Sequence, residues 1–94
     1  MAQQPPVSPL VNILIDREKY DLVRQAILGI LPDAENGMTW IELTELIGPL
    51  LPERLFRHMG TVRWYTRAVQ LDLEAQGEIM RIPDSKPLRL RRVA

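Results

Sequence analysis

The sequence predicts one α+β domain in which three helices and a short helical turn are followed by a β-hairpin. Apolar residues recur at helical spacing in three segments with capping residues, whereas the C-terminal segment alternates apolar and basic residues. A chain of 94 residues has room for one domain and one core. We therefore expect a flexible tail rich in proline and glutamine at 1–9 and a single domain at 10–94.

The first helix is expected to begin at Asp16 and to end before Pro32. Asp is a preferred N-cap residue, and Tyr20, Val23 and Ile27 recur at the spacing of one helix face. Pro32 cannot continue the helix because it lacks the backbone N–H and its ring clashes with the preceding turn.

An apolar run at 10–15 precedes this helix. It is either a short strand or an arm that packs on the domain, and such an arm can equally pack on a second copy of the chain. A homodimer formed through Leu10–Ile15 or through the first helix is therefore an alternative that the sequence leaves open.

The second helix is expected to begin at Thr39. Thr39 and Glu42 have the T-x-x-E spacing of a capping box, in which each side chain bonds the backbone of the other residue. Gly48-Pro49 should end or kink the helix, and a short helical turn is expected at 53–57. The apolar stripe of this helix comprises Leu43, Leu46, Ile47 and Leu50.

The third helix is expected to begin at Gly60-Thr61 and to run through Gln76, with Gly77 as its C′ residue. Two strands are expected at 78–82 and 87–92. They are joined by 83–86, where Pro83 at position i+1 and Asp84 at position i+2 suit a type I turn. Leucine alternates with arginine in the second strand, so one strand face is apolar and the other basic.

This order of elements resembles the winged helix-turn-helix superfamily, and more narrowly a small bacterial winged-helix family of unknown function. It is also similar to winged-helix modules at the start of some restriction-type proteins. The resemblance covers roughly residues 17–92, and it implies that the third helix is a recognition helix and the hairpin a wing. The stretches that carry it are Val62-Arg63-Trp64-Tyr65, Leu71-Asp72-Leu73-Glu74-Ala75-Gln76-Gly77-Glu78-Ile79 and Lys86-Pro87-Leu88-Arg89-Leu90-Arg91.

One feature departs from that pattern. A DNA-binding helix-turn-helix usually joins its two helices through three or four residues, whereas Gly48 to Gly60 intervenes here with two prolines and an extra helical turn.

Charge is distributed unevenly along a chain whose net charge is zero. Residues 1–52 hold three basic and seven acidic side chains, and residues 53–94 hold nine basic and five acidic ones. A basic C-terminal half suits an anionic partner, although the overall neutrality argues against tight binding to nucleic acid.

The resemblance implies a DNA-binding surface on the third helix and the hairpin, of the kind found in transcription regulators. The polar arc of the helix would enter the major groove, where arginine can donate to phosphate or guanine and glutamine to adenine. Basic side chains of the wing would contact adjacent phosphates. The candidate DNA-binding residues are Arg63, Thr66, Arg67, Gln70, Lys86, Arg89 and Arg91.

The sequence gives no sign of an enzyme, a metal site or a cofactor. There is no cysteine, His58 is the only histidine, and the glycines are isolated from one another. Asp72 lies within the apolar arc of the third helix, so we expect it to be buried with a structural partner, either Arg81 or Arg89 or backbone donors.

The alternative to DNA binding is a winged-helix module that binds another protein. It would be favoured if the basic residues were engaged in salt bridges with Glu74, Glu78 or Asp84. With neither a signal peptide nor a membrane-spanning run, we expect a cytoplasmic protein with no membrane or small-molecule partner.

Overall fold

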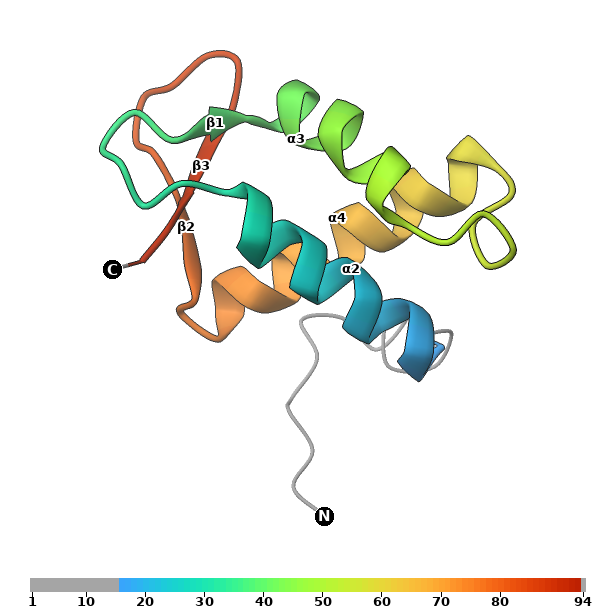
Figure 1. Cartoon of the computed structure of the whole chain (residues 1–94). Helices are drawn as coiled ribbons and strands as arrows, with labels where there is room; N and C mark the ends of the chain where they lie inside the picture. Colours follow the sequence, from blue (N-terminus) through green and yellow to red (C-terminus); the bar gives the residue numbers. More distant parts are fainter. Residues whose placement is uncertain (1–15, 94) are drawn as a thin grey trace.

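The expected α+β class is confirmed by a computed structural model, which describes residues 16–93 (Figure 1). The predicted tail 1–9 and the apolar run Leu10–Ile15 lie outside the described residues. The elements are α2 (Arg17–Ile30), β1 (Met38–Thr39), α3 (Trp40–Ile47), the 3-10 helix η1 (Gly48–Leu50), α4 (Met59–Ala75), β2 (Ile79–Arg81) and β3 (Arg89–Arg92).

Helix α2 begins and ends where its capping residues predict. The Asp16 side chain accepts a hydrogen bond from the Lys19 N–H at 3.2 Å, and Pro32 follows the last turn. Tyr20, Val23 and Ile27 are buried against the other helices, as their spacing predicts.

The capping box at the start of α3 is confirmed. The Glu42 N–H donates to Thr39 Oγ1 at 3.1 Å, and the Thr39 N–H donates to the Glu42 carboxylate at 3.0 Å. Hydrogen bonds from the Thr39 backbone and side chain stabilise the ionised carboxylate, which lowers the pKa of Glu42.

The apolar stripe of α3 is only half buried. Leu43 and Ile47 are fully buried, but Leu46 is 50% exposed and Leu50, in η1, is 61% exposed. The expected helix break at Gly48 is confirmed, because η1 tightens the chain there and rotates Leu50 away from the core.

The connection from η1 to α4 contains a single helical turn close to the one expected at 53–57. The N–H groups of Leu55 and Phe56 both donate to the Pro52 carbonyl, at 3.0 and 3.1 Å, and no helix continues from them. Phe56 is buried and packs edge-on against Tyr65 of α4, with ring centroids 6.0 Å apart, so the connection is fixed to the core.

The hairpin forms as expected, and it joins a third strand that the sequence did not reveal. The strand order is β1-β3-β2 with both pairs antiparallel, and Met38 of β1 is opposite Leu90 of β3. Gly37 precedes β1 with a φ of +62°, and a Cβ atom at that position would lie 2.2 Å from the Leu90 carbonyl oxygen. Only glycine therefore lets β1 approach β3 this closely.

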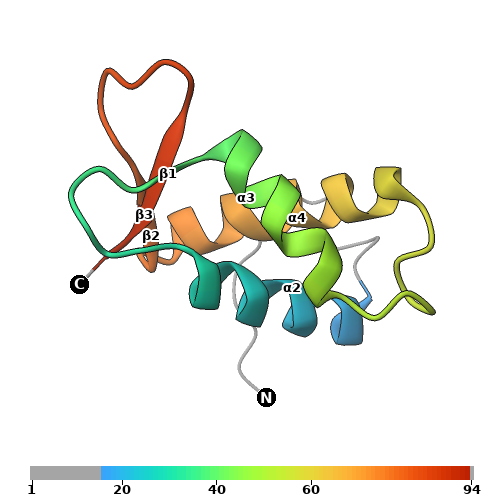
Figure 2. The ribbon, with the colours of Figure 1, turned by 45° about the horizontal axis from the view of Figure 1, so that its top comes forward.

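The turn between β2 and β3 is not the expected type I turn. Asp84 has a φ of +61°, whereas the second central residue of a type I turn has a negative φ. Aspartate tolerates this left-handed conformation better than most residues do. The loop carrying this turn extends beyond the body of helices (Figure 2).

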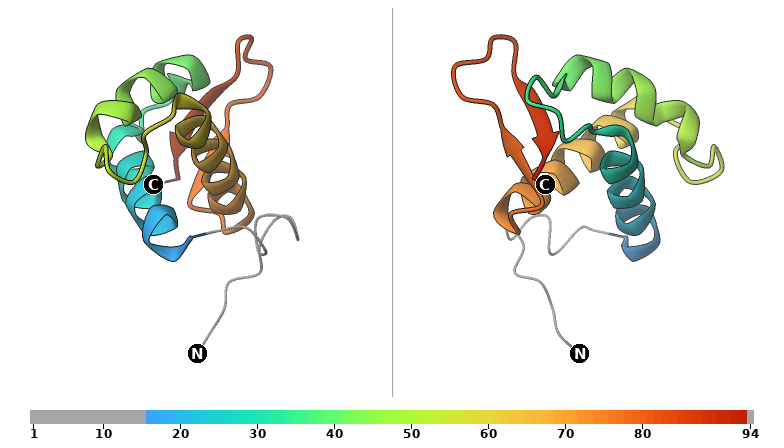
Figure 3. Two further views of the ribbon diagram at one scale, coloured as in Figure 1. Left: turned by 90° about the vertical axis from the view of Figure 1, so that its right-hand side faces the viewer. Right: turned by 60° about the vertical axis from the view of Figure 1, so that its left-hand side comes forward.

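The core lies where α4 crosses α2 and α3. Val69 and Leu73 of α4, Ile79 of β2 and Leu90 of β3 are fully or almost fully buried. Seen from the side, α2 and α3 lie on one side of the molecule and α4 with the β2–β3 hairpin on the other (Figure 3). Helix α4 and the hairpin therefore form one continuous side of the domain.

Candidate nucleic-acid interface

Two arginines of α4 project from the domain surface. Arg63 and Arg67 are both exposed, and they lie one turn apart along the helix. The Arg67 guanidinium lies over the indole ring of Trp40, 5.7 Å from its centroid, and donates to Gln70 Oε1 at 3.4 Å. The contact with Trp40 orients Arg67.

Thr66 and Gln70 do not belong to this surface, and their expected exposure is wrong. Both are completely buried. Thr66 Oγ1 donates to the Val62 carbonyl at 2.6 Å, and Gln70 Nε2 donates to the Glu74 carboxylate at 2.6 Å. The flank of α4 that carries Thr66 and Gln70 therefore faces the neighbouring elements, whereas the flank that carries Arg63 and Arg67 faces solvent.

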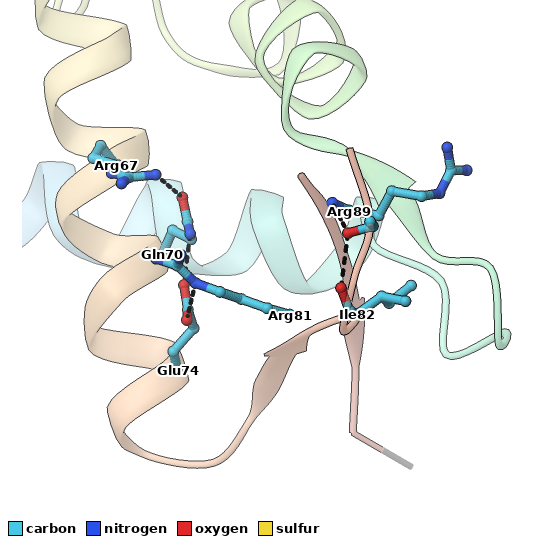
Figure 4. A network of polar contacts seen from close by, with 7 residues as sticks. Arg67, Gln70, Glu74, Arg81, Ile82 and Arg89 are labelled. Atoms are coloured by element: carbon cyan, nitrogen blue, oxygen red, sulfur yellow. Dashed lines mark hydrogen bonds and ion pairs between the residues drawn. The ribbon is translucent and has the colours of Figure 1, made fainter. Parts of the chain in front are cut away.

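A polar network explains that burial. It runs along α4 from Arg67 through Gln70 to Glu74 and then crosses to β2, where Arg81 Nε donates to the Glu74 carboxylate at 2.7 Å (Figure 4). Arg81 thus covers the side of α4 that carries Gln70. The network links the helix to the hairpin and fixes their relative position.

The basic residues of the hairpin reach main-chain carbonyls rather than carboxylates. Arg89 Nε donates to the Asn36 carbonyl at 2.7 Å, and Arg91 Nη1 donates to the Asp33 carbonyl at 3.3 Å. The end of the Arg89 guanidinium points away from α4 (Figure 4). Lys86 is exposed at the hairpin loop. Each side chain retains N–H groups that can donate to an anion.

None of these cations is neutralised by an ion pair within residues 16–93. The ion pairs found there are Arg17–Asp21, Arg24–Glu78, Arg54–Glu18 and Arg81–Glu74. Glu74 and Glu78, which could have engaged the basic face, are held by Arg81 and Arg24. Arg63, Arg67, Lys86 and Arg89 therefore keep their positive charge available at the surface.

Asp72 is buried as expected, but its predicted arginine partner is wrong. Its carboxylate accepts hydrogen bonds from the Tyr20 hydroxyl of α2 and from Gln76 Nε2, the latter at 2.9 Å. Arg81 bonds Glu74 instead, and Arg89 bonds the Asn36 carbonyl. Burial and the bond to Asp72 raise the pKa of Tyr20 to about 12. This pair joins α2 to α4 and faces away from the basic surface.

The remaining chemistry-bearing residues form no second site. His58 is exposed at the start of α4, and residues 16–93 contain no group of three or more side chains suited to hold a metal ion. Within the same part of the chain, no helix combines the length and the apolar character that a membrane crossing requires.

These features define the class of protein: an α+β domain of three helices and a three-stranded antiparallel sheet, with cations on the last helix and on the hairpin that have no ion-pair partner within residues 16–93. A family model described as a family of unknown function (DUF6958) matches residues 4–90, and the chain belongs to that family. The matched range begins inside 1–9, the segment expected to be a tail. Neither a curated protein nor a solved structure matches the chain.

Proposed function

We propose that this protein is a winged-helix domain that binds duplex DNA through α4 and the β2–β3 hairpin. The order of elements supports the winged-helix assignment, with the hairpin directly after α4 and a short strand before α3 completing the sheet. The observation that carries the proposal is the set of four cations, Arg63, Arg67, Lys86 and Arg89, that α4 and the hairpin carry without a carboxylate partner within residues 16–93.

The number of these cations sets the expected salt dependence. If each neutralises one phosphate, log K falls against log salt with a slope of about −3.6. The affinity then drops roughly 150-fold between 50 and 200 mM salt. A monomer with so few contacts binds weakly at physiological salt, with a Kd on the order of 10⁻⁴ to 10⁻⁶ M. A homodimer would bind more tightly by engaging two such faces on one duplex.

The test is fluorescence anisotropy of labelled random duplex DNA at several salt concentrations. We expect the Arg63→Ala/Arg67→Ala double variant, and separately Lys86→Ala/Arg89→Ala, to weaken binding and to lower the salt slope by about two each. The matched control is Arg17→Ala/Arg54→Ala, which removes the same charge from residues engaged with Asp21 and Glu18. Equal losses in all three variants would indicate a net-charge effect and would contradict a defined DNA-binding face.

A protein-binding module is the second candidate, because α3 and η1 expose large apolar side chains. Ile41, Leu46 and Leu50 are each at least half exposed. Apolar groups gathered on one element are typical of surfaces that contact other proteins. No detectable DNA binding at low salt would favour this candidate, and the same purified chain would then be used to search for a protein partner.

A further inference from the structure

Resting on the proposed DNA-binding function, we propose that this face binds the phosphate backbone of a duplex and tolerates any base sequence. Discrimination between base pairs in the major groove requires side chains that match their donor and acceptor patterns, above all amides for adenine and guanidinium groups for guanine. The structure removes the Gln70 amide and the Thr66 hydroxyl of α4 from the surface, leaves only the hydroxyl of Thr61 partly exposed in the first turn, and constrains one of the two guanidinium groups.

Gln70 cannot contact adenine in the arrangement observed. An amide that pairs with adenine uses its oxygen and its nitrogen together. In Gln70, Nε2 donates to Glu74 at 2.6 Å and Oε1 accepts from Arg67 at 3.4 Å, and the side chain is fully buried. If the Gln70 side chain turned toward solvent, the Glu74 carboxylate would lose one of its two hydrogen-bond partners, and Arg81 of the hairpin would be the other.

Thr66 is equally unavailable. Its hydroxyl donates to the Val62 carbonyl at 2.6 Å, and its side chain has no exposed surface. Other residues of α4 also keep exposed or partly exposed surface. Of these, Leu71 and Ala75 have apolar side chains, and Trp64 offers a single donor, its indole N–H.

The two arginines favour phosphate over guanine. The Arg67 guanidinium is held over the Trp40 ring and bonded to Gln70, which limits its extension toward the floor of a groove. Arg63 lines a groove of about 520 Å³ between the end of α3 and the start of α4, together with Glu45 and Arg57, and so lies toward α3. The basic residues of the hairpin lie on a separate element. Side chains that flank a groove in this way usually contact the phosphate oxygens of the DNA backbone.

The experiment compares wild-type binding to alternating A·T, alternating G·C and mixed-sequence duplexes of equal length at one low salt concentration. We expect affinities within about threefold of one another, because phosphate contacts are shared by all sequences. We also expect selection from a random duplex pool to enrich no motif. A preference above about tenfold, or an enriched motif, would overturn this inference and leave the proposed DNA binding intact. Absence of binding to every duplex would overturn both.

Two variants report on the buried groups separately. Thr66→Val and Gln70→Met keep the side-chain volume while removing the hydroxyl and the amide, and circular dichroism establishes that each variant is folded. We expect Thr66→Val to bind every duplex within about twofold of wild type. Gln70→Met also removes a partner of Arg67 and of Glu74, so we expect it to change the affinity for every duplex by the same factor, because neither side chain reaches a base. A folded variant that loses binding to one duplex class alone would show that the removed group contacts bases.

Discussion

Removing the hydroxyl of Tyr20 is the sharpest test of what holds α2 against α4. Tyr20→Phe keeps the buried ring, so the apolar contacts with the core remain. The change deletes the hydrogen bond that the hydroxyl donates to the Asp72 carboxylate, together with the contact between this hydroxyl and the Gln76 side chain. Asp72 is 4% exposed, so water cannot readily replace that donor, and Gln76 Nε2 remains beside the carboxylate.

The expected cost follows from leaving a buried carboxylate with one donor fewer. A buried polar group that loses its partner destabilises a protein by roughly 1–3 kcal/mol, with charged groups at the upper end. We expect Tyr20→Phe to lower the free energy of unfolding by about 2 kcal/mol and Tm by about 10 °C in a domain of this size. Urea denaturation at pH 7 measures the first quantity and a thermal scan the second.

The pH dependence provides a second signature of the same contact. The pKa of Tyr20 is about 12 in the folded protein against 10.0 for an ordinary tyrosine. Between these values the unfolded chain loses the Tyr20 proton while the folded chain keeps it, so this contribution is complete below pH 10 and declines toward pH 12. The stability difference between wild type and Tyr20→Phe should therefore shrink as the pH rises from 10 toward 12.

Two controls make the result decisive. Tyr65→Phe also removes a hydroxyl, but within residues 16–93 that hydroxyl accepts a bond from the Asp16 N–H alone, at 2.9 Å, so we expect a smaller loss of about 1 kcal/mol. A double-mutant cycle of Tyr20→Phe with Asp72→Asn isolates the coupling between the two side chains. A Tyr20→Phe stability within about 0.5 kcal/mol of wild type, with no difference in pH dependence, would refute the reasoning.

Three further substitutions test the backbone of the fold. Gly37→Ala should lower the free energy of unfolding by more than about 2 kcal/mol, because the alanine would be strained in a left-handed backbone conformation and its Cβ would clash with the Leu90 carbonyl. Urea denaturation measures this loss. A near-neutral result would contradict the close approach of β1 to β3. Gly29→Ala, in open space on α2, should stabilise by about 0.5–1 kcal/mol in the same assay. Thr39→Ala should cost about 1 kcal/mol. It should also weaken, without abolishing, the decline in stability as pH falls through the lowered pKa of Glu42, because the backbone N–H of residue 39 still donates to that carboxylate; an acid titration of both proteins measures the decline.

The features that sequence predicts well are those set by residues close together in the chain. The N-caps at Asp16 and Thr39 each bond a residue three positions later, and the end of α4 at Gly77 depends on one glycine with a φ of +78°. Such contacts need no knowledge of the rest of the fold, so residue type and spacing are sufficient.

The features that it misses depend on partners far along the chain. Strand β1 has only two residues, and it exists because Met38 and Thr39 pair with β3 about fifty residues later. The partner of Asp72 is Tyr20, 52 residues earlier, and no spacing rule indicates it. A buried carboxylate needs a hydrogen-bond donor, and we expected an arginine to provide it. In the structure a tyrosine hydroxyl donates instead.

The candidate site was predicted in part for a related reason. Helical periodicity separates polar from apolar residues of α4, but it does not show which polar residues a neighbouring element covers. Arg63 and Arg67 are on the surface as expected, whereas Thr66 and Gln70 are on the covered flank. A local clue existed, because Arg67, Gln70 and Glu74 are spaced so that their side chains can bond along one helix.

The indole of Trp40 beneath the Arg67 guanidinium gives the molecule an intrinsic optical probe. A phosphate that draws Arg67 away changes the surroundings of that ring, so tryptophan emission should report occupancy of the face without any attached dye. Trp64, whose ring contacts Tyr65 at a centroid distance of 5.0 Å, is the only other tryptophan in the chain, and Trp64→Phe would leave Trp40 as the single emitter. Binding can then be titrated with unlabelled protein and unlabelled duplex. Quenching of the Trp40 emission by iodide would distinguish an indole ring covered by the Arg67 guanidinium from an uncovered one.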